Sequence, residues 1–383
     1  MYRNLFYSRK FLALYARVRI LITFFFSLFS FSAIPIDIKA NKSNPLTGNK
    51  KIAKRIFASY KKMKDNQKKN IFEPSAMWQK MLNENYSELI ESYEEDNFKK
   101  FNSFLNNFGQ SKKYLGITYN ILLPNFFGFF KNSYIKKIVI ENQLKNWIFF
   151  NKKKSIKYLH TKPYGNLKGA LINKSSYVTY TSFFNEIYGS MITDLIKDRK
   201  KPVISEIGSG YGEQAYFILL KLKKATYICF DIPEVLVLSS FFLMNSYPQK
   251  KSLLYGEEKN FPSSLKKYDL IFYPQQEIVK MKNNSVDMMI NKYSLGEMSK
   301  ITVKAYISKI EKITDYFFHV NQDFHYRNLK KKTKNLLASE YVPNKKKFNL
   351  LVRYLDMSHF IFDKFINYNM DTFFHIYKKK FTK

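Results

Sequence analysis

Residues 202–212 read PVISEIGSGYG, and a helical run over 213–222 follows them directly. A short apolar strand, a glycine turn and a helix in that order are typical of the crossover that begins a nucleotide-binding α/β sheet. Glycine is required at such a turn because the backbone bends sharply and a ligand approaches where a Cβ atom would collide with it. The stretch therefore predicts a parallel α/β sheet with a ligand site beyond the carboxyl end of this strand.

The spacing of the glycines and of the next acidic residue restricts the kind of ligand. The turn reads G-x-G-x-G, and the last glycine of the dinucleotide pattern G-x-G-x-x-G would fall on Glu213, whose carboxylate would face a pyrophosphate. A second strand over 225–230 ends at Asp231, 19 residues after Gly212. An acid there is placed to accept hydrogen bonds from both hydroxyls of an adenosine ribose. The spacing argues against NAD and favours a ligand without phosphates.

These motifs resemble a known family. EIGSGYG (206–212) and FDIP (230–233) look like the S-adenosylmethionine site of the Rossmann-like, class I methyltransferases. More narrowly, EIGSGYGEQAYFIL (206–219), YICFDIPEVLVLSSFFL (227–243) and NKYSLGEMS (291–299) resemble the bacterial sugar O-methyltransferases. The likeness runs from about residue 157 to the C-terminus, is weaker around Trp78 and does not cover residues 1–70.

The resemblance implies an α/β fold with a Rossmann-like, seven-stranded methyltransferase sheet, helices on both faces and a mostly helical N-terminal region before it. Further strands are expected at 269–273, 286–292 and 316–321, followed by antiparallel last strands at 348–355 and 372–377. Apolar residues at helical spacing predict helices over 77–93, 98–108, 135–150 and 177–196. A Pro74-Ser75 start signal precedes the first of these helices, and Ser299 is expected to cap a helix over 301–313.

The resemblance also implies S-adenosylmethionine as cofactor. Glu206 and the three glycines are expected to line the methionine part and Asp231 to bind the ribose, whereas the amides after the third strand are expected to reach the adenine. The complete set of expected cofactor residues is Glu206, Gly208, Ser209, Gly210, Tyr211, Gly212, Asp231, Ile232, Gln275, Gln276 and Asn291.

Methyl transfer to a sugar hydroxyl needs alignment of the acceptor and a general base within hydrogen-bond reach. The candidates at the correct edge of the sheet are Glu297, His325 and Asp323, with Glu297 preferred because the S-x-x-E-M string places it just after the fourth strand. Glu297 is equally well interpreted as a helix-start carboxylate favoured by the helix dipole. For His325, a solvated loop imidazole is favoured over a base. The histidines show no ligand spacing and Cys229 is the single cysteine, so no metal site is predicted.

The charge of the chain is concentrated at its ends. The 65 Lys and Arg against 30 Asp and Glu give +35, of which residues 1–70 carry +14 (16 basic, 2 acidic) and residues 324–383 carry +10 (14 basic, 4 acidic). Only 8 of the basic residues are Arg, the usual side chain for base-edge recognition, so a solvated surface is favoured over a nucleic-acid site. Two alternatives stay open: an RNA methyltransferase or basic nucleic-acid-binding protein with a degenerate site, and a small-molecule methyltransferase that acts on a phenol or carboxylate.

The N-terminal residues predict a separate segment. Five Arg and Lys precede an apolar run of 17 residues at 20–36, which is short for a bilayer span of about 20 residues. Residues 1–40 are therefore interpreted as a peripheral membrane anchor, a targeting peptide or an overextended start. A basic linker is expected over 41–70, a helical region over 71–195 and the methyltransferase domain over 196–383. Since the cofactor is supplied in the cytosol, a cytoplasmic location, with possible association with a membrane face, is expected.

Overall fold

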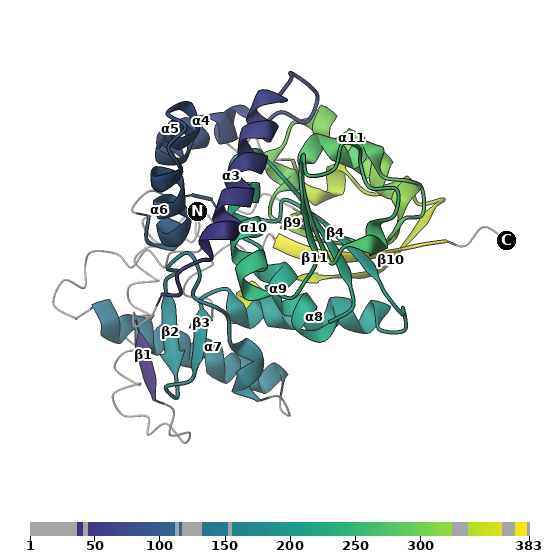
Figure 1. Ribbon diagram of the computed structural model, residues 1–383. Helices are drawn as coiled ribbons and strands as arrows, with labels where there is room; N and C mark the ends of the chain where they lie inside the picture. Colours follow the sequence, from purple (N-terminus) through teal and green to yellow (C-terminus); the bar gives the residue numbers. More distant parts are fainter. Residues whose placement is uncertain are drawn as a thin grey trace, which may run out of the picture.

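The computed structural model describes residues 37–40, 45–111, 115–116, 132–151, 155–323, 336–361 and 372–380. Its centre is an eight-stranded sheet in the order β10-β11-β9-β8-β4-β5-β7-β6 (Figure 1). The strands are β4 (Val203–Ile207), β5 (Thr226–Asp231), β6 (Ser252–Leu254), β7 (Leu270–Pro274), β8 (Val286–Lys292), β9 (Thr314–Gln322), β10 (Phe348–Leu355) and β11 (Thr372–Lys379). The strands from β6 to β9 pair in parallel, whereas β11 pairs antiparallel with both β9 and β10.

The strand order confirms the Rossmann-like α/β fold. From β4 the chain continues to β5 on one side and later returns to β8 on the other, so the order reverses at β4. All seven predicted strands are present, and the last two lie at the end of the sheet as expected. Only β11 runs antiparallel to the rest of the sheet, because β10 is antiparallel to β11 and so has the direction of β9. The eighth strand, β6, was not predicted, because its three residues are too few to give a periodic signal. A reversal of this kind opens a crevice at the carboxyl ends of β4 and its neighbours.

Helices cover both faces of the sheet (Figure 1). Tyr227 and Cys229 of β5 belong to the same apolar cluster as α8 (Ser182–Ile196), α9 (Glu213–Lys221) and α10 (Pro233–Ser246). Ile228 and Phe230, which alternate with them, belong to a second cluster with α11 (Lys300–Ile313). Because both faces are buried, the central strands are apolar at nearly every position.

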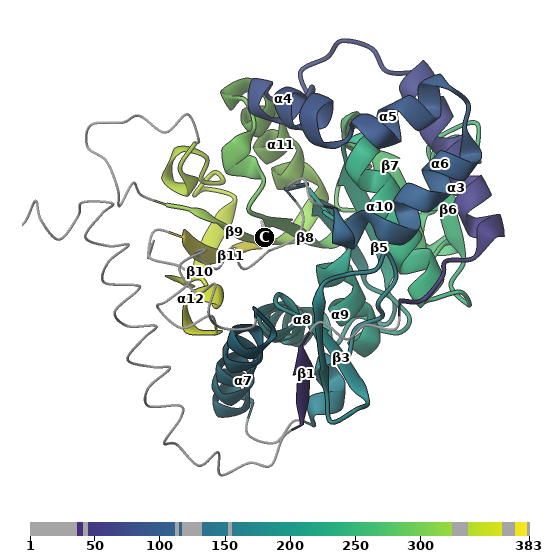
Figure 2. The ribbon, with the colours of Figure 1, turned by 90° about the vertical axis from the view of Figure 1, so that its left-hand side faces the viewer.

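The N-terminal part adds a helical layer beside α10. It comprises α3 (Lys50–Asp65), α4 (Ala76–Asn85), α5 (Ser87–Glu94) and α6 (Phe98–Asn107), and α3 packs against α10 (Figure 2). The structure thus replaces much of the linker predicted over 41–70 with a helix that buries Ala53, Ile56, Phe57, Tyr60 and Met63. The many lysines of this segment obscured that pattern of three- and four-residue steps. They lie mostly on its exposed side.

The region predicted as mostly helical over 71–195 also contributes two strands to a small antiparallel sheet. It consists of β1 (Ile38–Ala40), β2 (Gly169–Ile172) and β3 (Ser176–Thr179), so the predicted helix 177–196 begins as a strand. The predicted helix 77–93 is divided into α4 and α5 at Tyr86. Other predictions hold: α6 and α7 (Asn132–Phe150) are present, and Ser75 and Ser299 cap α4 and α11. The remaining helical pieces are α12 (Ser358–Ile361) and the 3-10 turns Phe108–Gln110, Ile156–Leu159, Leu265–Lys267, Gln275–Lys280, Leu295–Glu297 and Ala338–Glu340.

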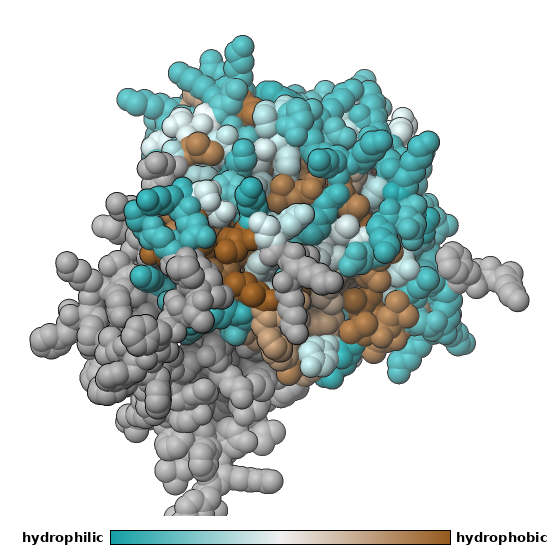
Figure 3. Space-filling view, turned by 90° about the horizontal axis from the view of Figure 1, so that it is seen from below, coloured by the Kyte–Doolittle hydropathy of each residue, from teal (hydrophilic) through white to brown (hydrophobic). Residues whose placement is uncertain are grey.

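Hydrophilic and hydrophobic areas alternate over the part of the surface in Figure 3 that the described residues form. Among the described residues, no helix has the length and apolar character needed to cross a bilayer. The apolar run at 20–36, on which the anchor hypothesis depends, lies outside the described residues.

Candidate functional site

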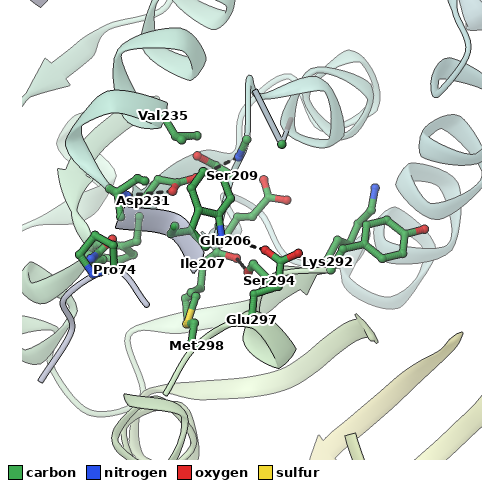
Figure 4. A pocket seen from close by; sticks show the side chains of 18 of the residues that line it. Pro74, Glu206, Ile207, Ser209, Asp231, Val235, Lys292, Ser294, Glu297 and Met298 are labelled. Atoms are coloured by element: carbon green, nitrogen blue, oxygen red, sulfur yellow. Dashed lines mark hydrogen bonds between the residues drawn. The ribbon is translucent and has the colours of Figure 1, made fainter. Parts of the chain in front are cut away.

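A cavity of about 280 Å³ lies at the carboxyl edge of the sheet, beside the point where the strand order reverses. Its wall includes the glycine turn after β4, the start of α10 after β5, the segment after β8, and an N-terminal arm that includes Phe72, Pro74 and Trp78. Residues of α8, α9 and α11 and Gln275 after β7 also line the cavity. Figure 4 shows Pro74 and Asp231 on one side, Glu206 near the centre and Lys292 on the other side. A crevice at this edge is where ligands of open α/β sheets bind.

The glycine turn is shaped by backbone angles that favour glycine. Gly208, Gly210 and Gly212 have φ values of 73°, 55° and 93°. A Cβ on Gly208 would overlap the hydroxyl of Ser294, and a Cβ on Gly212 would lie 2.9 Å from Leu243 Cγ on α10. Gly208 and Gly210 line the cavity, whereas Gly212 is needed for the packing of α9 on α10. The turn therefore presents bare backbone to the cavity at Gly208 and Gly210.

Asp231 is fixed at the end of β5 with its carboxylate in the cavity wall. Its Oδ2 accepts a hydrogen bond from the Gly210 amide at 3.0 Å, and its Oδ1 accepts one from the Ile232 amide at 2.8 Å. The side chain and the amide of Ser209 also interact with this carboxylate, so a hydroxyl bound at Asp231 would share its oxygens with these donors. Burial raises the pKa of Asp231 to about 7, which the hydrogen bonds from the backbone counteract in part.

Glu206 lies beneath the turn and is only 2% exposed. It accepts a hydrogen bond from the Tyr227 hydroxyl at 2.8 Å. Burial raises the pKa of Glu206 to about 8, although the positive charge of Lys292 acts in the opposite direction. A cationic group bound beside this carboxylate would favour its ionised form.

The cavity is acidic although the chain is strongly basic. Five of its lining residues are acids, namely Glu73, Glu206, Glu213, Asp231 and Glu297, and a single lining residue, Lys292, is a base. The chain as a whole carries +35. This arrangement disfavours a phosphate group in the cavity and favours a ligand with positive charge.

The other predicted cofactor residues divide into two groups. Ser209, Tyr211 and Ile232 line the cavity, and so does Gln275, whose side-chain amide donates to the carbonyl of Phe72. Gln276 and Asn291 do not line the cavity.

Asn291 instead supports the turn from below. It is fully buried, its side-chain amide donates to the Ile207 carbonyl at 2.8 Å, and its Oδ1 accepts from Asn321 at 2.9 Å. Its predicted place at the end of β8 is correct, but its side chain holds the backbone and is turned away from the ligand space.

The three candidate bases lie in different places. Glu297 lines the cavity and accepts a hydrogen bond from the Trp78 indole at 2.8 Å, and burial raises its pKa. Asp323 lines a separate cavity beside β10, where Arg353 Nε donates to it at 2.6 Å. His325 lies outside the described residues. Only Glu297 of these three is placed in the wall of the cavity by the structure.

Two features of the site were missed from the sequence. The arm that contains Phe72 and Trp78 closes one side of the cavity, and the only early sign of it was the weak family likeness around Trp78. Lys292 was not among the predicted site residues, although a lysine that ends a strand as apolar as VDMMIN is a sign of a partly buried charge. Among the described residues, no group of three His, Cys, Asp or Glu side chains is placed to hold a metal ion.

Comparisons with known proteins leave the family open. No family model matches the chain and no curated protein matches its sequence, so membership of the sugar O-methyltransferase family stays a prediction. Solved structures that resemble part of the chain include the pyocyanin biosynthetic protein PhzM, with 10% identity and a TM-score of 0.32 over 52% of this chain and 56% of that one. The mitomycin 7-O-methyltransferase MmcR has 8% identity and a TM-score of 0.31 over 52% of this chain and 57% of that one. The small RNA methyltransferase HEN1 has 9% identity and a TM-score of 0.33 over 51% of this chain and 25% of that one. The chain thus matches little more than half the length of the first two and a quarter of the third. Likenesses this distant do not indicate a substrate, and the fold assignment rests on the strand order.

Proposed function

We propose that the protein is an S-adenosylmethionine-dependent O-methyltransferase that acts on a hydroxyl of a sugar or glycan precursor. The observation that carries the proposal is the acidic cavity beside a turn of bare backbone, at the strand reversal of a chain with net charge +35. S-adenosylmethionine combines a nucleoside, a sulfonium cation and an amino acid, and it has no phosphate. Its charge and shape suit this donor set better than those of a dinucleotide.

The residues of the cavity fit this cofactor. Asp231 would accept the ribose hydroxyls through its carboxylate oxygens, and Ile232 and Val235 would pack against the nucleoside. The glycine turn would allow close approach of the amino-acid part, with Glu206 beneath it. The cofactor, when bound, supplies an electrophilic methyl carbon on a sulfonium sulfur that leaves as a neutral thioether.

The protein has two tasks in such a reaction, alignment and proton removal. Glu297 is the proposed general base, because it lies in the cavity wall and its raised pKa suits proton uptake from a hydroxyl near neutral pH. The arm with Trp78 donates to the Glu297 carboxylate and would exclude water from that side.

The acceptor is the least constrained part of the proposal. The sugar class follows from the likeness of the segment NKYSLGEMS to the sugar O-methyltransferases, and Ser294 and Glu297 of this segment line the cavity. The acids of the wall disfavour a phosphate-rich acceptor, which weighs against the RNA-directed alternative. A cytosolic location, with residues 1–40 in contact with a membrane, is part of the same proposal.

Calorimetric titration with S-adenosylhomocysteine tests the cofactor assignment. Wild-type protein is expected to bind the ligand with micromolar affinity, and Asp231→Ala to bind it at least about tenfold more weakly, since a charge-assisted hydrogen bond contributes about 1.5–3 kcal/mol. Asp287→Ala is the matched control, because Asp287 also lies on a strand of the sheet but outside the cavity. Absence of binding to the wild type at millimolar ligand would rule out the proposal.

A further inference from the structure

Lys292 is the only cationic residue among the described residues that line the cavity. It ends β8, and its ammonium group donates to the side-chain oxygens of Asn185 and, at 2.9 Å, Gln214. An ammonium group has three N–H donors, so two are used by these amides and one remains for a ligand.

The two amides are held with their oxygens toward the lysine. Asn185 donates its side-chain N–H to the Glu213 carboxylate at 2.7 Å, and Gln214 donates its own to the Asn185 backbone carbonyl at 3.2 Å. Glu213 in turn accepts from Thr179 at 2.5 Å and from Ser182 at 3.0 Å. Since a carboxylate only accepts hydrogen bonds, this relay fixes the orientation of Asn185 and presents an oxygen to Lys292.

Aromatic rings surround the same ammonium group. The rings of Phe184, Tyr188 and Tyr293 lie with their centroids 5.3, 5.5 and 5.9 Å from Lys292 Nζ. Asp356 accepts the hydroxyls of both tyrosines, at 2.6 Å and 2.7 Å. Tyr293 has a φ of 59°, which is unusual for a residue with a bulky side chain and is a form of backbone strain found at functional sites. The rings and the two amides therefore hold the ammonium group in place and attract its cationic form, whereas burial acts in the opposite direction and lowers the pKa of Lys292 to about 8.

The charges of Glu206 and Lys292 influence each other without forming an ion pair. Each changes the pKa of the other: Lys292 favours the ionised form of Glu206, and Glu206 favours the charged form of Lys292. Among the ion pairs of the described residues, none joins these two groups within 4.0 Å. In Figure 4 Glu206 lies between Asp231 and Lys292. The cavity thus presents, in order, a carboxylate suited to a diol, a second carboxylate and a cation.

We propose that Lys292 binds the carboxylate of the amino-acid end of the cofactor, and that Glu206 faces its ammonium group. The inference rests on the proposed function and extends it, because it assigns the one cation of the cavity to the one anion of the ligand. The zwitterionic end of the ligand then lies between two opposite charges that are unpaired in its absence, and the ribose lies at Asp231. In the competing arrangement, Lys292 binds the methyl acceptor and does not contact the cofactor.

The test is a cycle of two ligands and two proteins, measured by calorimetry without any turnover. The ligands are S-adenosylhomocysteine and its decarboxylated analogue, and the proteins are the wild type and Lys292→Met. Loss of the carboxylate is expected to weaken binding to the wild type about 10- to 100-fold and binding to Lys292→Met less than about threefold. Lys309→Met is the matched control, since Lys309 is a partly buried lysine that donates to the carbonyls of Val279 and Met281 away from the cavity.

Each outcome separates the two proposals. An equal loss of affinity in the wild type and in Lys292→Met would overturn the role of Lys292 and leave the cofactor assignment intact. Equal binding of both ligands by the wild type would do the same, without reliance on any variant. If Lys292→Met does not fold, Lys292→Gln takes its place, with circular dichroism as the measure of folding. Failure of the wild type to bind either ligand would instead reject the proposed function.

Discussion

Glu297, the proposed general base, is positioned in the cavity wall by its neighbours. Its 3-10 turn follows β8 directly, which brings the carboxylate to the edge where ligands of this fold bind. The Trp78 indole donates to it at 2.8 Å, and burial raises its pKa above the usual value for a glutamate. A carboxylate held in this way is a better proton acceptor near neutral pH than a solvated one.

We expect Glu297→Gln to keep the affinity for S-adenosylhomocysteine and to lower kcat by about 10²- to 10⁴-fold, because the amide cannot accept the hydroxyl proton. The measurement is methyl transfer to whichever sugar the wild type accepts, together with calorimetry. Glu277→Gln is the control, since Glu277 is a buried glutamate that pairs with Lys280 outside the cavity. A kcat equal to that of the wild type would remove Glu297 as the base.

At the scale of elements, α3 shows that a basic segment can be a structural part of the domain. Its Asn49 cap accepts from the Lys51 amide at 2.8 Å, and its apolar side packs on α10, which follows the strand that carries Asp231. On its polar side, Lys64 donates to the buried Glu234 of α10 at 2.7 Å. The helix therefore braces the element that forms one wall of the cavity.

Ile56→Ala is expected to lower the free energy of unfolding by about 2–5 kcal/mol, because it leaves a void between α3 and the domain. Lys51→Ala, on the exposed side of the same helix, is expected to change it by less than about 0.5 kcal/mol. Urea titration followed by tryptophan fluorescence measures both. If 41–70 were a detached linker, as its composition suggests, the two variants would unfold alike.

At the scale of the whole molecule, the distribution of charge separates the surface from the site. The lysines give the chain its +35, yet the cavity collects acids, because the polar residues at the strand ends converge there. Burial raises the pKa of Asp231 to about 7 and that of Glu206 to about 8, so both carboxylates lose their protons within the physiological range. Lys292, the one lysine among the described residues that line the cavity, has its pKa lowered to about 8 by its burial.

These values predict opposite pH dependences for the empty and the bound protein. Because both pKa values lie above the ordinary ones, the stability that the two carboxylates contribute to the empty protein is present at low pH and is lost as the pH rises through about 7 and 8.

The affinity for a sulfonium cation is expected to increase as the pH rises, since ionised carboxylates attract the cation. We expect the affinity ratio of S-adenosylmethionine to S-adenosylhomocysteine to rise between pH 6 and 8, by up to about tenfold per pH unit for each proton released. Calorimetry of both ligands across this range measures the ratio, and a flat ratio would contradict the expectation.

Local signals in the sequence determined the strand, turn and helix of the glycine motif, the acid at the end of β5 and the positions of the predicted strands along the chain. Each of these depends on residues within one or two elements: the glycines must adopt positive φ, and a buried parallel strand must be apolar. Such patterns are visible without knowledge of distant contacts. The fold class and the presence of most of the turn residues in the cavity wall could therefore be predicted, whereas their binding of a cofactor stays a prediction.

The tertiary structure alone decided which of the candidate polar residues share one cavity. Trp78 and Glu297 are 219 positions apart and Lys292 and Asn185 are 107 positions apart, so no local pattern could bring them together. The same long-range packing turned Asn291 beneath the turn, paired Asp323 with Arg353 and made α3 part of the domain. Periodicity indicates which side of an element is buried, but the partner against which that side packs is fixed only when the whole chain has folded.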